Sequence, residues 1–166
     1  SFYWSYREIF IDEIYKFNST NNSPFIIDCG SNCGTSILYF KQLYPNAKII
    51  GIEADPDIFS ILKTNISQRP IDNVTLLNRA MSNEKGQIKF YSVGADGGRT
   101  YKIDDPLHTY NVDTVLLDDL INDHEVDFLK MDIEGLEVDV LCSSKKLNQV
   151  KQMFIEYHSF DEESQR

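Results

Sequence analysis

Short apolar runs alternate with longer helical patterns along this chain, and no other feature constrains its fold as strongly. Strands are expected at residues 25–28, 47–53, 74–78, 86–93, 126–131 and 152–157, and helices at residues 6–17, 35–44, 57–67 and 136–141. The helical segments carry apolar residues at a spacing of three and four, which places them on one stripe. Because strands that alternate with helices pair in parallel, the pattern predicts an α/β fold with a doubly wound, mostly parallel sheet.

The length of 166 residues favours a single domain, because it suffices for one compact core and is short for two. We expect a helix and linker over residues 1–23 and the α/β core over residues 24–158. Few residues follow the last predicted strand, so we expect the final strands of such a sheet to be absent.

The charge and composition of the chain limit the kinds of partner and the location that we expect. A formal net charge of -10 without a basic stripe argues against nucleic acid. The longest apolar runs fall far short of the roughly 20 residues that cross a bilayer, so we expect no membrane span. The first residues lack the order of a secretory signal, which favours a cytoplasmic location. Three cysteines without a second pair at metal spacing predict no zinc site, and no feature indicates an oligomeric state.

A glycine turn joins the first predicted strand to the next helix, in Asp28-Cys29-Gly30-Ser31-Asn32-Cys33-Gly34. Gly30 allows a sharp turn and the close approach of a ligand, and Gly34 allows the helix to pack closely on the sheet. Free N–H groups at the start of the helix favour a carboxylate-bearing ligand. Glycine turns that bind nothing are common, but here Glu53 ends the second strand 25 positions after Asp28.

An acidic side chain at the end of the second strand can bind both hydroxyls of a ribose, in a nicotinamide dinucleotide or in S-adenosylmethionine (SAM). The dinucleotide fingerprint requires a further glycine at the position of Asn32, where the pyrophosphate approaches, so SAM is favoured. SAM needs its amino-acid part bound, and Asp28 is a candidate to receive the ammonium group. The alternative role for Asp28 is that of a strand-end cap.

Charged residues also follow the strand predicted at residues 126–131, in Lys130-Met131-Asp132-Ile133-Glu134-Gly135. Ligands of open α/β sheets gather at the carboxyl ends of the strands. Asp132 and Glu134 are therefore candidates to orient SAM or an acceptor hydroxyl. Such oxygens also suit a hard metal ion, although we predict no metal site. The alternative is a solvated strand end in which Lys130 pairs with a carboxylate.

His158 follows the last predicted strand at the same edge and is the first candidate for a general base. A hydroxyl acceptor loses its proton as it attacks a methyl group, and neutral histidine suits this task near neutral pH. A structural or exposed histidine is the alternative. The glycine-rich segment at residues 94–98, with Arg99 and Tyr101 after it, is expected either to face the acceptor or to form a solvated connection.

Three segments resemble the FkbM-type SAM-dependent methyltransferases, a family of the class I, Rossmann-like group. They are the turn from Asp28 to Gly34, the stretch Gly51-Ile52-Glu53-Ala54-Asp55-Pro56, and Phe128-Leu129-Lys130-Met131-Asp132-Ile133-Glu134-Gly135-Leu136-Glu137. The Lys-x-Asp-x-Glu-Gly element is the most family-specific, and the resemblance covers residues 25–158. The family often has Glu-Pro-Asp-Pro in the second segment, and Ala54 keeps both carboxylates.

The resemblance implies that SAM is the cofactor and that a methyl group passes to an oxygen of a sugar or other small acceptor. It places SAM at the turn, with Glu53 at the ribose and Ala80 near the adenine, flanked by Asn78 or Met81. The expected cofactor-binding residues are Asp28, Gly30, Ser31, Asn32, Gly34, Glu53, Ala54, Ala80 and Asp132. His158, Asp132 and Glu134 are the expected catalytic residues.

Two other functions remain open at this point. One is an oxidoreductase that uses a nicotinamide cofactor, because Glu53 can bind the ribose of either cofactor. The other is a SAM-binding module without catalysis, which the end of the chain at Arg166 and the uncertain general base suggest.

Overall fold

The computed structural model describes residues 2–94, 98–100 and 106–158. Its main sheet has five parallel strands in the order β3-β2-β1-β7-β8. These strands are β1 (Phe25–Cys29), β2 (Lys48–Glu53), β3 (Val74–Asn78), β7 (Phe128–Met131) and β8 (Met153–Ile155). The order confirms the predicted doubly wound, parallel sheet.

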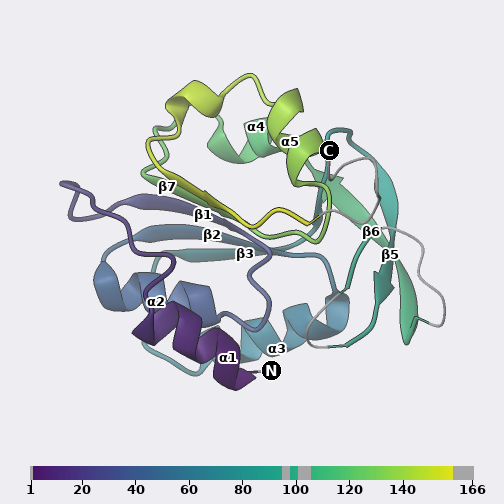
Figure 1. The fold of residues 1–166 in the computed structure, drawn as a ribbon, viewed down its shortest axis with the longest axis horizontal. Coiled ribbons are helices and arrows are strands. Elements are labelled where there is room, and N and C mark those ends of the chain that lie inside the picture. The colour runs from purple at the N-terminus through teal and green to yellow at the C-terminus, as the bar shows by residue number, and fades with distance from the viewer. Residues whose placement is uncertain (1, 95–97, 101–105, 159–166) are drawn as a thin grey trace.

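Helices cover both faces of the main sheet (Figure 1). On one face lie α2 (Thr35–Leu43) and α3 (Pro56–Ser67), together with α1 (Phe2–Tyr6) and the π-helical turn η1 (Arg7–Ile11) that continues it. On the other face lie α4 (Leu117–Ile121) and α5 (Glu137–Ser143). The short 3₁₀ turn η2 (Leu147–Gln149) leads into β8. None of the described helices is long and apolar enough to cross a membrane.

The central strand β1 explains why the core has two parts. Ile26 packs with Phe40, Leu62 and other residues on the α2–α3 face, whereas Ile27 packs with Leu120 and its neighbours on the α4–α5 face. Both isoleucines are fully buried. A strand that is covered on both faces reads as a continuous apolar run, which is the pattern its sequence shows.

The position of β1 also determines where a ligand can bind. From β1 the chain moves outward to β2 and β3, and it returns to β7 on the other side of β1 before adding β8. The direction of winding therefore changes between β1 and β7. In open α/β sheets, ligands bind outside the carboxyl ends of the strands at such a switch point.

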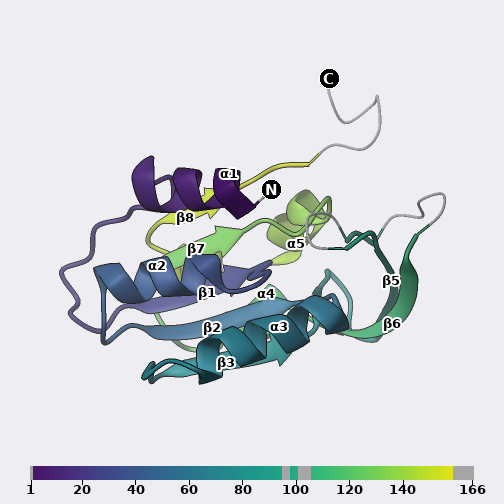
Figure 2. The ribbon, with the colours of Figure 1, turned by 90° about the horizontal axis from the view of Figure 1, so that it is seen from below.

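A second, smaller sheet lies at one end of the main sheet (Figure 2). It contains β4 (Ala80–Met81), β6 (His108–Val115) and β5 (Gln87–Ser92), in that order. Of these three strands, only β5 is predicted from the sequence. In β6 the residue Val112 alone is buried, so the strand lacks a clear apolar alternation and depends on its pairing with β5. The five-residue helix α4 is also missed, because it is too short to show a period.

The helix predicted at residues 6–17 is wrong in its bounds. Helical structure covers residues 2–11 and stops at Asp12, after which Glu13 has a positive φ of 53°. Tyr15 and Phe17 are nevertheless buried, and the Phe17 ring stacks on Phe128 with centroids 4.5 Å apart. The apolar spacing therefore reflects an irregular segment that packs on the sheet.

Candidate functional site

A cavity of about 330 Å³ lies at the carboxyl ends of β1, β2 and β7, at the switch point of the main sheet. This volume is within the range of roughly 300–1,000 Å³ that small-molecule sites occupy. The end of β2 contributes Glu53 to its wall, the loops after β1 and β7 contribute Gly30, Asn32, Asp132 and Glu134, and the second sheet contributes Ala80, Met81 and Phe90. The N-terminal helical segment adds Trp4, Ser5 and Glu8.

The loop after β1 can take its place only because of its glycines. Gly30 has a φ of +78°, and a Cβ atom there would lie 1.8 Å from the carbonyl oxygen of Asp132. The two loops at the switch point are therefore in direct contact. Gly34 has a φ of +94°, and its Cβ would lie 2.8 Å from Leu62 of α3. Gly34 thus serves packing against α3 rather than directly against the sheet.

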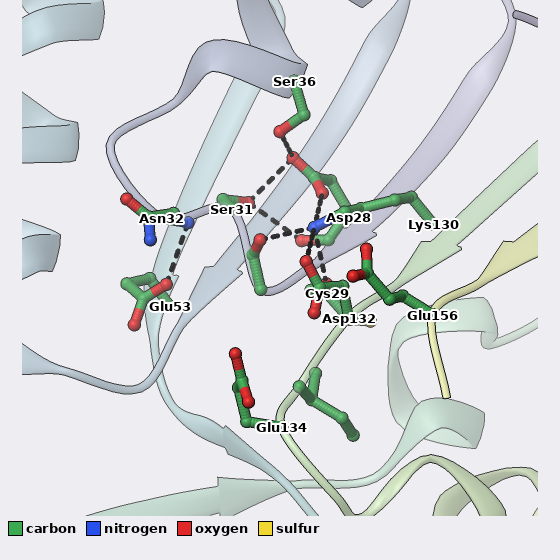
Figure 3. A network of polar contacts seen from close by, with 12 residues as sticks. Asp28, Cys29, Ser31, Asn32, Ser36, Glu53, Lys130, Asp132, Glu134 and Glu156 are labelled. Carbon is green, nitrogen blue, oxygen red and sulfur yellow. Dashed lines mark hydrogen bonds and ion pairs between the residues drawn. The ribbon is translucent and has the colours of Figure 1, made fainter. Parts of the chain in front are cut away.

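Glu53 joins the end of β2 to the glycine loop (Figure 3). Its Oε2 accepts a hydrogen bond from the backbone N–H of Asn32 at 2.9 Å, and its Oε1 accepts one from the N–H of Asp55 at 2.9 Å. Burial raises the pKa of Glu53 to about 7, although both N–H groups favour the charged form. Each carboxylate oxygen keeps a lone pair for a ribose hydroxyl.

Asp28 lies behind the loop and not in the cavity. Its carboxylate is fully buried, and Oδ2 accepts hydrogen bonds from Ser36 at 2.6 Å and from Ser31 at 3.0 Å (Figure 3). Its Oδ1 lies 3.6 Å from the ammonium of Lys130. Direct contact with an ammonium group in the cavity is not open to Asp28 in this arrangement, so its role is to support the loop.

Lys130 connects the two loops at the switch point. Its Nζ donates a hydrogen bond to the carbonyl of Gly30 at 2.6 Å and lies 3.5 Å from Oδ2 of Asp132. Burial by itself would lower the pKa of Lys130, but the charges of Asp28 and Asp132 outweigh burial and raise it. Lys130 therefore pairs with carboxylates, as the alternative expected, but it is a buried cation and not part of a solvated strand end.

His158 lies among four carboxylates. Its Nδ1 is 3.5 Å from Glu137 and 3.9 Å from Asp132, and its Nε2 is 3.8 Å from Glu156 and 3.9 Å from Glu134. Partial burial by itself would lower the pKa of His158, but the charges of Glu134, Asp132 and Glu137 raise it. The imidazole is thus next to two residues of the cavity wall, where the sequence predicts a base.

The same residues include a possible set of metal ligands. Asp132, Glu134 and His158 each offer one ligand atom, and these atoms lie within 4.8 Å of one another. Partly exposed acidic groups often gather in this way without an ion. We assign no metal to them.

The structure divides the predicted cofactor residues into two groups. Those that line the cavity are Gly30, Asn32, Glu53, Ala54, Ala80 and Asp132. Asp28, Ser31 and Gly34 lie underneath and hold the loop in shape. In the segment predicted to face the acceptor, Gly94, Gly98 and Thr100 line the cavity, Arg99 pairs with the backbone of Tyr91, and Tyr101 lies outside the described residues.

Several residues of the wall are not predicted from the sequence, among them Trp4, Glu8 and Phe90. No local signal could place Trp4 or Glu8 there, because they are far from the motifs along the chain. Asp55 stands inside a motif but was assigned no role. Asp55 is one of the residues that line the cavity, and its Oδ1 caps α3, whereas its Oδ2 is buried and has no hydrogen-bond partner among the described residues.

These features suit a nucleoside that carries an amino acid. Glu53 offers acceptors for ribose hydroxyls, and Gly30 keeps the backbone next to the cavity free of a side chain. Ala54, Ala80 and Met81 give an apolar surface for a base. This combination of hydrogen-bond acceptors and apolar surface therefore fits SAM.

Comparisons with known proteins agree with this chemistry. Residues 28–166 match the family described as Methyltransferase FkbM domain. The chain is similar to Methyltransferase sdnD of Sordaria araneosa, with 26% identity over 82% of this chain and 66% of that protein. It is also similar to 2-O-methyltransferase NoeI of Sinorhizobium fredii, with 27% identity over 81% of this chain and 63% of that protein. The chain thus spans slightly less than two-thirds of the length of these relatives.

A solved structure shows the same fold. The crystal structure of Methyltransferase FkbM from Methylobacillus flagellatus superposes with a TM-score of 0.60 at 18% identity, over 87% of this chain and 34% of that chain. This likeness confirms the Rossmann-like architecture. Because the family match covers most of the chain, including the turn, Glu53 and the Lys-x-Asp-x-Glu-Gly element, this chain belongs to the FkbM methyltransferase domain family, whose methyl donor is S-adenosyl-L-methionine.

Proposed function

We propose that this domain transfers the methyl group of SAM to a hydroxyl oxygen of a sugar or another small molecule. The observation that carries the proposal is the cavity at the switch point, where Glu53 and the glycine loop meet Asp132 and Glu134. The printed name of the relative NoeI, a 2-O-methyltransferase, supports oxygen as the atom that is methylated. The family match favours SAM over the nicotinamide alternative.

When bound, SAM supplies a methyl group on a positively charged sulfur, and transfer to oxygen leaves S-adenosylhomocysteine (SAH). In the proposed mechanism Glu53 accepts hydrogen bonds from the ribose hydroxyls of SAM, and the loop at Gly30 and Asn32 holds the amino-acid part of SAM. Asp132 and Glu134 orient the acceptor hydroxyl. Alignment of oxygen, carbon and sulfur supplies much of the acceleration, because it removes the entropic cost of their encounter.

The proton of the acceptor hydroxyl needs a destination. His158 lies beside Asp132 and Glu134, which line the cavity, so it can take that proton through them. Because the pKa of His158 is raised, the neutral, basic form of its imidazole predominates only at pH values above the ordinary pKa of histidine. We expect His158→Ala to lower kcat while it leaves the affinity for SAH within about twofold, because the imidazole is not part of the cavity wall.

Titration calorimetry with SAM and SAH tests the cofactor part of the proposal. We expect the protein to bind both, and we expect Glu53→Ala to raise the Kd for SAH by about 10–100-fold, since hydrogen bonds to charged groups contribute roughly 1.5–3 kcal/mol. Glu84→Ala is the control, because this exposed carboxylate is not part of the cavity wall. A folded protein that binds neither ligand would end the proposal.

Transfer is tested with SAM that carries a radiolabelled methyl group and with extracts and purified glycans as acceptors. Label that appears on an oxygen supports the proposal. Binding of SAH without transfer to any acceptor would favour a SAM-binding module that lacks catalysis.

A further inference from the structure

The N-terminal helical segment forms one side of the cavity. Trp4 and Ser5 of α1 and Glu8 of η1 line it, although they are far along the chain from the other lining residues. In Figure 2, α1 lies in front of the edge of the sheet that holds β8, on the face that also carries α2 and α3. The segment therefore approaches the cavity from the side of β7 and β8, where Asp132 and Glu134 also lie.

Packing on the protein body holds this segment in place. Ile9 is buried, and the ring of Phe10 packs edge-on against Tyr39 of α2 with centroids 5.5 Å apart. Farther along, Tyr15 packs in the same way against Phe154 of β8 at 4.9 Å. The contribution of Trp4 and Glu8 to the wall is thus a consequence of tertiary packing.

Trp4 presents an aromatic surface that its own helix does not cover. Trp4 is 57% exposed; Tyr3 packs edge-on against its ring at 5.7 Å, and the guanidinium of Arg7 lies 6.0 Å from the ring centroid. A large exposed indole beside a cavity offers a flat apolar face together with a polar N–H. Such a surface suits a ring that has an apolar face and hydroxyl groups around its edge.

The charge of the wall restricts the ligand further. Five carboxylates and one guanidinium belong to the lining residues that the structure describes, namely Glu8, Glu53, Asp55, Asp132, Glu134 and Arg79. Ionised carboxylates only accept hydrogen bonds, so hydroxyl donors satisfy them and anionic groups meet like charge. SAM, with its positive sulfonium, is compatible with this surplus of negative charge.

We propose that Trp4 and Glu8 form the acceptor side of the cavity and that they select an uncharged, polyhydroxylated ring, such as a neutral sugar, over an anionic one. Trp4 stacks on the ring of the acceptor. Glu8 accepts hydrogen bonds from its hydroxyl groups and repels carboxylate or phosphate substituents. This inference rests on the proposed function, because it assigns the acceptor of that reaction.

The experiment compares neutral and anionic glycosides with SAH bound. The neutral probes are the methyl glycosides of glucose, galactose and N-acetylglucosamine, and the anionic probes are those of glucuronic and galacturonic acid. Trp4 is the only tryptophan of the chain, so its fluorescence reports directly on occupancy. We expect at least one neutral glycoside to change this fluorescence and its uronic acid counterpart to bind about tenfold more weakly or worse, because of like-charge repulsion.

Variants separate the two residues. We expect Trp4→Ala to weaken the neutral glycoside about tenfold, as read by saturation-transfer NMR, because the aromatic contact is lost. Glu8→Gln should reduce the difference in affinity between the neutral and the anionic glycosides. Ile11→Ala is the control, because Ile11 is 65% exposed on the same segment and is not part of the cavity wall. All three variants should bind SAH within about twofold of the parent.

Three results would overturn the inference. They are equal or tighter binding of the anionic probes, no binding of any glycoside while SAH is bound, and a loss of SAH affinity in Trp4→Ala, which would place the indole at the cofactor. Calorimetry of SAH on the same samples distinguishes these from failure of the proposed function, in which SAH itself does not bind.

Discussion

Lys130 is the residue on which the geometry of the site depends most. Its ammonium contacts the backbone of the loop after β1 and the carboxylates of Asp28 and Asp132, and its side chain is only 3% exposed. A buried cation of this kind costs desolvation energy, and its attraction to neighbouring carboxylates offsets that cost only while they are in place. The ion pairs therefore hold two loops together more than they add stability.

We expect Lys130→Met to lower the free energy of unfolding by about 3–5 kcal/mol, because it leaves the buried carboxylate of Asp28 without a counter-charge. Urea unfolding measures this change. Lys85→Met is the matched control: its ion pair with Asp119 is 67% exposed on the lysine side, so its loss should cost less than about 1 kcal/mol. The double variant Asp28→Asn with Lys130→Met should recover part of the stability. Equal effects at the two lysines would contradict a buried ionic role.

At the scale of elements, α3 shows how one residue ends a strand motif and begins a helix. Asp55 follows β2, and its Oδ1 accepts hydrogen bonds from the N–H groups of Asp57 at 2.9 Å and Ile58 at 3.3 Å. Pro56 occupies the first turn, where its missing N–H costs nothing. The start of α3 is thereby tied to the position of Glu53, which accepts the N–H of Asp55.

This cap gives a prediction for the element. We expect Asp55→Ala to destabilise the protein by about 1 kcal/mol more than Asp55→Asn does, because asparagine caps a helix about as well as aspartate and alanine does not. Thermal unfolding monitored by circular dichroism measures the difference. If the two variants unfold at the same temperature, the cap hydrogen bonds of Asp55 contribute no measurable stability.

At the scale of the whole molecule, the proton affinity of Glu53 couples the site to global stability. Its pKa in the folded state is about 7, above that of an ordinary glutamate, because it is buried. Between pH values of about 4.5 and 7 the folded state therefore binds more protons at this position than the unfolded state does. With that sign, the contribution of Glu53 to stability declines as the pH rises through this window.

We expect the free energy of unfolding of the parent protein, minus that of Glu53→Gln, to fall by about 3 kcal/mol as the pH rises from 4.5 to 7.5. Urea unfolding of both proteins across this range measures it. Subtracting the variant removes the opposing effects of other groups, such as Asp118 and Asp127, whose pKa values are lowered. If this difference in the free energy of unfolding stays constant or rises with pH, the pKa of Glu53 is not raised in the folded state.

Local sequence is enough to predict the order in which strands and helices follow one another along the chain and the residues that end the key strands. Ile26 and Ile27 had to lie in a strand that is covered on both faces, and Gly30 had to stand at a tight turn. Glu53 had to end the neighbouring strand. These features are local, because apolar runs and backbone conformation depend on residues that are close along the chain.

The directions in which the side chains of the site point depend on tertiary structure. It turned Asp28 toward Lys130 and away from the cavity, placed His158 among four carboxylates, and brought Trp4 to the wall. It also created β6, whose mixed sequence becomes a strand by pairing with β5. The physical reason is that these contacts join residues far apart in the chain, and their energies depend on packing, charge and burial that exist only once the sheet has formed.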